Sequence, residues 1–234
     1  MSEAPARAAD PRREVQRRLA RVQAGTGVVF ATFLALHLVN TMLGALGPAV
    51  YDGVQRVLRL YYQLLPVEVV IVASGTVHFV VGIVRIALGR PAATNLRARA
   101  HRYAGYTLVL FFFGHVIATR APSFLGVGPS LGFAGLTYSE AYLPAFFFPY
   151  YVLLGIAGLH HLLQGLLVAA GVLGWRIPAV LTRPRVLRPV VGIGSVLIVV
   201  AVLAFAGALF PVHDPMDNDF ARFASALVAR YLGR

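Results

Sequence analysis

Five histidines of this 234-residue chain lie inside long apolar stretches, where titratable side chains are costly and usually functional: His37, His78, His115, His160 and His161. A neutral imidazole nitrogen is a good metal ligand, so histidines on facing helices could hold a metal-containing group. A single histidine in a membrane is more often a hydrogen-bond partner between helices. Histidines on four successive apolar stretches favour the ligand interpretation.

The histidines of the first and third stretches share one spacing. Gly27 precedes His37 by ten residues, and Gly105 precedes His115 by ten residues. An arginine stands near the start of each of these two stretches. The shared pattern indicates two similar helices that run in the same direction.

The histidines of the second and fourth stretches share a different pattern, His-x-x-x-Gly. It joins His78 to Gly82 and His161 to Gly165. A glycine one helical turn from a ligand lets a flat macrocycle approach the backbone closely. His160 points about 100° away from His161 on a helix, so we expect only one of the two to be a ligand. The motif favours His161 and leaves His160 as the alternative.

Imidazoles from facing helices of a bundle are what a membrane-embedded haem requires, and the four stretches therefore predict two b-type haems. We pair His78 with His161 because they share a motif, and His37 with His115 for the same reason. At the helical rise of about 1.5 Å per residue, His37 and His115 lie farther from the cytoplasmic ends of their helices than His78 does. We therefore expect His37 and His115 to form the outer site. Ligation by two histidines closes both faces of the iron, which favours electron transfer.

These histidines must be positioned by helices that cross a membrane. The chain is 58% hydrophobic and only 13% charged, with a mean hydropathy of +0.73. Its long apolar runs fall at residues 25–46, 66–89, 103–119, 145–173 and 189–210. Each reaches or approaches the length of about 20 residues that spans a bilayer as a helix. We therefore expect an all-α integral membrane protein, a bundle of five transmembrane helices with haem sites between the first four.

The charge distribution predicts the orientation. All 21 basic residues are arginines, and 15 of them precede the first span or follow the second and fourth spans. Three acidic residues share that side, whereas the other side carries six arginines and six acids. The positive-inside rule then puts the N-terminus in the cytoplasm and the C-terminus outside. Since orientation explains the net charge of +12, nucleic-acid binding is not expected.

We divide the chain into a basic cytoplasmic segment, 1–24, a membrane domain, 25–210, and an outer segment, 211–234. Residues 12–22 could form an amphipathic helix on the membrane surface or belong to a disordered basic tail. Phe220, Phe223, Leu227 and Tyr231 recur at helical spacing. That stripe could lie in the membrane interface or pack on the bundle.

The segments that connect the predicted spans contain fewer informative sequence patterns. The stretch 120–144 is rich in Gly, Pro and Ser and is expected to be irregular, whereas 47–68 is too polar and aromatic for a simple turn. His101 lies among arginines and His213 lies in a His-Asp-Pro turn. We expect both to be solvated and assign no function to either.

Two segments carry a resemblance to a known family. Arg21-Val-Gln-Ala-Gly-Thr-Gly27 through His37, and His161-Leu-Leu-Gln-Gly-Leu166, are similar to the first and fourth helices of the cytochrome b membrane anchors of succinate:quinone oxidoreductases. The resemblance is to the five-helix, two-haem kind found in succinate dehydrogenases and fumarate reductases.

The resemblance implies the same two histidine pairs, with the inner haem near an iron–sulfur subunit. It also implies an iron–sulfur and a flavoprotein subunit on the cytoplasmic face of a bacterial inner membrane, and electron relay between them and membrane quinone. The polypeptide itself would catalyse no reaction.

A quinone site needs hydrogen-bond donors and a proton route beside an apolar slot. The candidates on the outer side are Glu68, Arg59, Tyr62 and Gln63. Glu68 could accept a proton, or it could form an ion pair with Arg56 or Arg59. The candidates on the inner side are Gln164, Arg85 and Trp175.

Other chemistry finds little support. Cysteine is absent, which excludes disulfides and cysteine-ligated iron–sulfur clusters in this chain. Neither a zinc-protease motif, a phosphate-binding loop nor a serine triad occurs. The alternative to electron transfer is a membrane scaffold of the same fold, with or without haem, with a lipid-related or partner-docking role.

Overall fold

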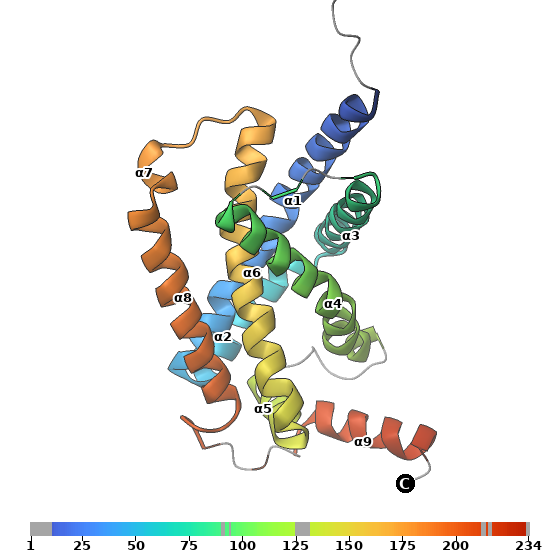
Figure 1. The fold of residues 1–234 in the computed structure, drawn as a ribbon. Helices are drawn as coiled ribbons and strands as arrows, with labels where there is room; N and C mark the ends of the chain where they lie inside the picture. The colour runs from blue at the N-terminus through green and yellow to red at the C-terminus, as the bar shows by residue number, and fades with distance from the viewer. Residues whose placement is uncertain are drawn as a thin grey trace, which may run out of the picture.

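The computed structural model describes residues 11–89, 92–93, 95–124, 132–211, 214 and 217–232, and within these ranges it contains helices and no strand (Figure 1). Five helices are long and apolar enough to cross a membrane: α1 (Pro11–Leu43), α3 (Leu65–Ala87), α4 (Leu96–Phe124), α6 (Pro144–Leu173) and α8 (Pro184–Phe205). The prediction of an all-α fold with five candidate spans is confirmed. This indicates an integral membrane protein.

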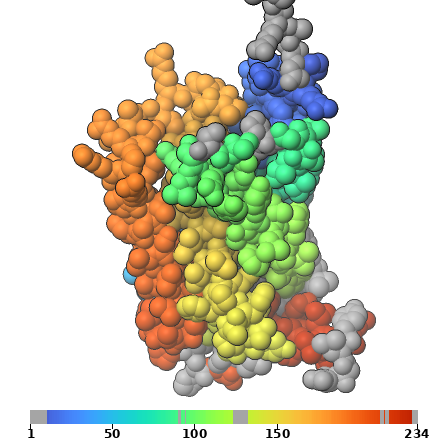
Figure 2. Space-filling view, in the orientation of Figure 1, coloured from blue at the N-terminus to red at the C-terminus, as the bar shows by residue number. Residues whose placement is uncertain are grey.

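The bundle has two different ends because successive long helices alternate in direction (Figure 1). We call the end where α1 begins the arginine-rich end; α3 and α6 finish there, and α4 and α8 start there. We call the other end the opposite end. Figure 2 shows α4, α6 and α8 side by side on one face. Large apolar side chains point outward from the long helices, as a lipid environment requires; Leu110 is 73% exposed and Ile193 is 63% exposed.

Shorter helices join the long ones: η1 (Gly44–Leu46), α2 (Pro48–Tyr62), α5 (Phe133–Tyr142), α7 (Ala179–Thr182) and α9 (Asp219–Leu232). Proline in the first turn begins α2, α3, α6 and α8, where its missing N–H costs no hydrogen bond. Gly174 ends α6 in the left-handed conformation, with φ of 75°. The stretch 47–68, too polar for a simple turn, thus contains a helix.

Helix α6 lies at the centre of the bundle and packs on α1, α4 and α8 (Figure 1). Its contact with α8 depends on two glycines. A Cβ at Gly155 would lie 2.7 Å from Ile198, and a Cβ at Gly194 would lie 2.5 Å from Leu159. Small residues allow such close approach between membrane helices.

The most deeply buried side chains gather at the opposite end of the bundle. Tyr51 of α2, Phe133 of α5 and Phe205 of α8 form a triad of edge-to-face rings with centres 5.1 to 5.9 Å apart. Asp52 accepts a hydrogen bond from the Phe133 backbone N–H and so caps the start of α5. Helices α2 and α5 therefore belong to the folded core of the bundle rather than to a surface loop.

Helix α3 lies at the edge of the bundle (Figure 1). Its backbone packs closely on α1 and, at one end, on α2. It contacts α4 through long side chains. Phe79 packs on Phe112 with ring centres 4.5 Å apart, and the Glu68 carboxylate accepts two hydrogen bonds from Arg120, of 2.5 and 2.9 Å. A space between α3 and α4 is thereby left for other side chains.

Two expectations about the connections are wrong. Residues 12–22 form neither a separate surface helix nor a disordered tail, because α1 begins at Pro11 and continues into the span without a break. The stretch 120–144 is not irregular throughout, because residues 133–142 form α5 and residues 133 and 135–140 are buried. Residues 125–131 lie outside the described residues.

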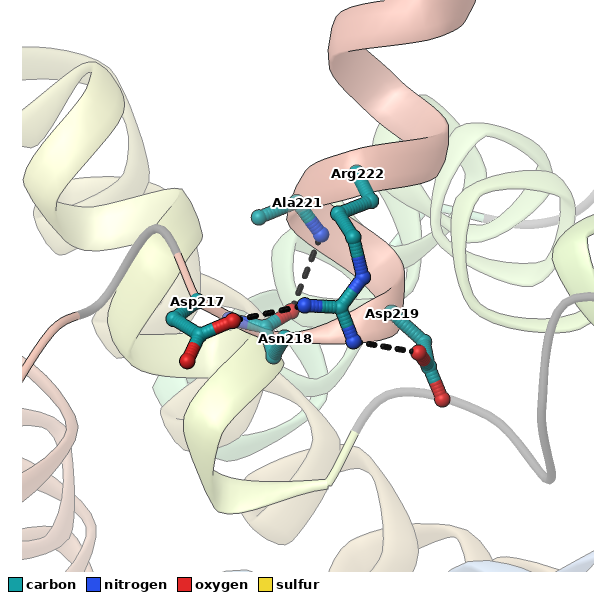
Figure 3. A network of polar contacts seen from close by, with 5 residues as sticks. All are labelled: Asp217, Asn218, Asp219, Ala221 and Arg222. Atoms are coloured by element: carbon teal, nitrogen blue, oxygen red, sulfur yellow. Dashed lines mark hydrogen bonds and ion pairs between the residues drawn. The ribbon is translucent and has the colours of Figure 1, made fainter.

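Helix α9 begins with a polar cap (Figure 3). The Asn218 side chain accepts a hydrogen bond from the Ala221 N–H, and the Arg222 guanidinium pairs with Asp217 and Asp219. On the other face, Phe220 packs on Tyr138 of α5 with ring centres 5.7 Å apart. The first turn of the predicted apolar stripe thus packs on the bundle, whereas Leu227 is exposed. The side chain of Tyr231, like all of His213, lies outside the described residues.

Candidate functional site

The structure brings together the histidines of both predicted pairs. The ring centres of His78 on α3 and His161 on α6 lie 6.0 Å apart, with the rings nearly perpendicular. Those of His37 on α1 and His115 on α4 lie 5.9 Å apart. Two imidazoles that bind one metal ion, each at a metal–nitrogen distance of about 2 Å, have ring centres roughly 6 Å apart. Both pairs have this spacing.

In three of these four histidines, the Nδ1 atom is held by a neighbour. The Nδ1–H of His78 donates to the Gln23 backbone oxygen at 2.9 Å, and that of His161 donates to the His101 backbone oxygen at 3.3 Å. The Nδ1 of His115 is hydrogen-bonded to the Tyr150 hydroxyl at 3.2 Å. Histidines that bind a metal through one ring nitrogen usually engage the other in this way. Since these bonds occupy Nδ1, a metal would bind these rings through Nε2.

His37 is oriented by ring packing. Its imidazole stacks on Phe33 with centres 5.6 Å apart and planes at 18°, and Phe33 in turn packs edge-on against Tyr62 of α2. Tyr62 therefore lies one aromatic ring away from His37. The position of α2 explains why a segment outside the long helices reaches this pair.

A cavity of about 150 Å³ opens beside His78 and His161, between α1, α3, α4 and α6. It is lined mainly by apolar side chains. All four glycines of the two sequence patterns line this cavity: Gly27, Gly82, Gly105 and Gly165.

Two of these glycines lie against histidines of other helices. A Cβ at Gly27 would lie 2.7 Å from the His78 ring, and a Cβ at Gly105 would lie 3.1 Å from the His161 ring. Each glycine thus makes room for a histidine on another helix. His37 and His115 lie ten residues further along α1 and α4, so the two pairs are about 15 Å apart along the bundle.

A polar network borders the cavity at the arginine-rich end. The Arg85 guanidinium donates to the Gln23 side-chain oxygen at 2.6 Å and to that of Gln16 at 3.3 Å. Gln23 also carries the backbone oxygen that holds His78. Arg85, predicted only as an inner quinone candidate, is therefore linked through one glutamine to the inner histidine pair.

His101 is a candidate site residue that the sequence analysis assigned no function. It is half-buried, lines the cavity, and stacks on His161 with ring centres 4.3 Å apart and planes at 14°. The expectation that it is solvated is wrong, because α4 begins earlier than the apolar run and carries His101 into the bundle. Its spacing of four residues from Gly105 was the available signal. His160 does not line the cavity, and its buried Nδ1 has no hydrogen-bond partner among the described residues.

The outer quinone candidates occupy different surroundings. Both carboxylate oxygens of Glu68 are bound by Arg120, not by Arg56 or Arg59 as the sequence suggested. Arg59 and Gln63 are half-buried near the end of α2, and burial lowers the pKa of the Arg59 guanidinium. Burial raises the pKa of the Tyr62 phenol. Of these candidates, Tyr62 is connected to a histidine, because it packs on Phe33, which stacks on His37.

Two further pockets, each of about 420 Å³, lie at the two ends of the bundle. The one at the arginine-rich end includes Trp175, Arg97 and Gln164, and the Arg97 guanidinium donates to the Gln164 side chain. The one at the opposite end, which we call the outer pocket, is lined by residues of α4, α5, α6 and α9 and by Leu143 between α5 and α6, and it includes His115. The aromatic run at residues 146–151 is the sequence signal for this pocket.

In comparisons with known proteins, no family model, no curated protein and no solved structure matches the chain. Among the described residues, no group of three or more His, Cys, Asp or Glu side chains is arranged to hold a metal ion. The candidate sites are therefore the two-histidine pairs, which suit a metal whose remaining ligands come from a macrocycle.

Proposed function

We propose that the chain is a membrane electron-transfer subunit that binds two b-type haems, one between His78 and His161 and one between His37 and His115. The observation that carries this proposal is the 5.9 to 6.0 Å spacing of the two imidazole pairs on four successive candidate spans. The Nδ1 hydrogen bonds of three of the four rings support it, since they leave Nε2 for the iron.

The residues around the inner pair fit a haem in donor type and in polarity. When bound, each haem would supply a reversible one-electron couple at its iron. His78 and His161 would hold the iron through their ring nitrogens, and the apolar lining would keep water out. Arg85 and Arg102 line the arginine-rich side of the cavity, where the acidic side groups of a haem would find partners.

The arginine-rich end is proposed as the cytoplasmic face, with the N-terminus inside, in a bacterial inner membrane. Its 15 arginines against three acids offer a docking surface to an acidic partner or to anionic lipid. Under the resemblance to the succinate:quinone oxidoreductase anchors, the partner would be the iron–sulfur subunit of a complex that also holds a flavoprotein. Electrons would pass between that subunit and membrane quinone.

A reduced-minus-oxidised spectrum of the purified protein, with a haem-to-protein ratio, tests the proposal. Two haems per chain are expected. His161→Ala should remove the inner component of the spectrum, whereas the matched variant His160→Ala should retain both. If the wild-type chain binds no haem, the electron-transfer proposal fails, and the alternative of a membrane scaffold with a lipid-related or docking role takes its place.

A further inference from the structure

The outer pocket has the composition of a site for a small planar ligand. It measures about 420 Å³, and aromatic rings form much of its wall, with the hydroxyls of Thr119, Ser139 and several tyrosines among them. An apolar, aromatic pocket with a few convergent polar groups is the usual form of a small-molecule site. The remaining wall comes from α9, whose Phe220, Ala224 and Val228 recur every four residues and line the pocket together.

This pocket is in direct contact with His115 of the outer histidine pair. His115 itself lines the pocket, and so does Tyr150, whose hydroxyl is hydrogen-bonded to the His115 Nδ1 at 3.2 Å. A ligand in the pocket would therefore lie against the histidine that holds the outer haem in the proposed function. The Glu68 carboxylate does not line this pocket, and Arg120 binds both of its oxygens.

A buried acid stands behind the pocket. Glu140 on α5 is only 2% exposed, and neither of its carboxylate oxygens has a hydrogen-bond partner among the described residues. Burying a carboxylate in its ionised form without a partner is costly, so the group favours holding a proton. The Tyr151 hydroxyl is hydrogen-bonded to Ser139 and interacts electrostatically with Glu140. Tyr151 and Ser139 both line the pocket, so the electrostatic interaction of Tyr151 with Glu140 connects the buried acid with the pocket wall.

We propose that the outer pocket binds the headgroup of a quinone, and that Glu140 exchanges protons with it by way of Tyr151. This inference rests on the proposed function for its electron route. Conversion of a quinol to the quinone breaks two O–H bonds and releases two protons and two electrons. The electrons would pass one at a time to the haem that the outer histidine pair would hold. The two protons would pass in turn by way of the Tyr151 hydroxyl to the ionised Glu140 carboxylate, which releases the first proton before it accepts the second. Reduction of the quinone runs the same steps in reverse.

Filling the pocket from α9 tests its occupant. Ala224→Trp puts a large ring into the pocket, whereas Ala226→Trp adds the same ring at an exposed position of the same helix. Binding of short-chain ubiquinone and menaquinone analogues to the purified protein should weaken by about tenfold or more in the first variant and stay unchanged in the second, because the ligand and the indole need the same space. Val228→Trp repeats the test if Ala224→Trp does not fold.

The result separates this inference from the proposed function, because quinone binding and haem content are measured independently. Unchanged quinone affinity in both pocket variants, or no binding by the wild-type chain, overturns the pocket assignment even when both haems are present. Loss of affinity in Ala224→Trp with haem content preserved supports it. Quinone binding by a chain without haem leaves the pocket in place and overturns the electron route.

The role of Glu140 needs a second measurement. Glu140→Gln keeps the shape of the side chain and removes the exchangeable proton. Quinone affinity and haem content should match those of the wild type, while the rate of haem reduction by a quinol analogue falls by about a hundredfold, the usual contribution of a positioned acid or base. Tyr151→Phe should slow the same reaction. An unchanged rate in Glu140→Gln overturns the proton assignment.

Discussion

Gly27→Ala tests the contact between Gly27 of α1 and the His78 ring of α3. The new Cβ would lie 2.7 Å from His78 Nδ1 and 2.8 Å from its Cε1. Ordinary contacts between non-bonded heavy atoms are about 3.5–4.0 Å, so the ring must retreat by roughly 1 Å. Such a shift exceeds the deviation of about 0.2 Å that a metal–ligand bond tolerates. It also breaks the 2.9 Å bond from His78 to Gln23.

We therefore expect Gly27→Ala to weaken haem binding at the inner pair by about 10- to 100-fold, the usual effect of disturbing the group that orients a metal-binding histidine. The assay is the haem-to-protein ratio of the purified variant, together with its reduced-minus-oxidised spectrum. The ratio should fall from two to one, and the component that His161→Ala removes should disappear.

Gly25→Ala is the matched control, because a Cβ at Gly25 meets nothing within 4 Å. It should keep both haems, and it should stabilise α1 slightly since alanine is the better helix former. A Gly27→Ala protein with both haems intact would refute the packing of Gly27 against His78. Loss of the outer component instead would mean that Gly27 supports the site of His37 rather than that of His78.

Three further outcomes follow from the same geometry. Gly105→Ala, whose Cβ would lie 3.1 Å from His161, should also weaken the inner site, whereas Gly114→Ala, with nothing within 4 Å, should not. Burial raises the pKa of Glu140 to about 7, so the folded state keeps a proton that the unfolded state has lost between pH 4.5 and 7. The free energy of unfolding should therefore fall by about 3 kcal/mol between pH 4.5 and 7 and level off above pH 7. Thermal unfolding measured across this range should show the fall in the wild type and not in Glu140→Gln. The same pH dependence in both proteins would contradict the burial of this acid. Glu68→Gln should lower stability by about 2 kcal/mol through loss of the charged bonds to Arg120, and an unchanged melting temperature would show that the pair contributes little.

The sequence predicted what depends on repetition along a helix. The length of the apolar runs marked the five long helices. The His-x-x-x-Gly motif favoured His161, which lines the cavity, over His160, which does not. The sequence did not reveal the neighbours of Gly27 and Gly105, because spacing within a helix does not show which other helix packs there. Gly27 follows this rule, since it makes room for a histidine 51 residues further along the chain.

Elements without a long apolar run were harder to predict. Helix α5 has ten residues inside a stretch rich in Gly, Pro and Ser, and its burial comes from α2, α6, α8 and α9 packing around it. His101 was misjudged because its neighbours in the sequence are charged, although its ring faces His161 in the bundle. The salt bridge of Glu68 joins residues 52 positions apart. Each of these features depends on tertiary contacts.

The edge position of α3 bears on how a loaded protein could be assembled. His37 and His115 belong to α1 and α4, so a haem between them needs no residue of α3. The inner pair needs His78, and α3 reaches α4 through the Phe79–Phe112 and Glu68–Arg120 contacts. In the proposed function, the docking of α3 on α4 would therefore complete the inner site, whereas α1 and α4 alone bring the outer pair together.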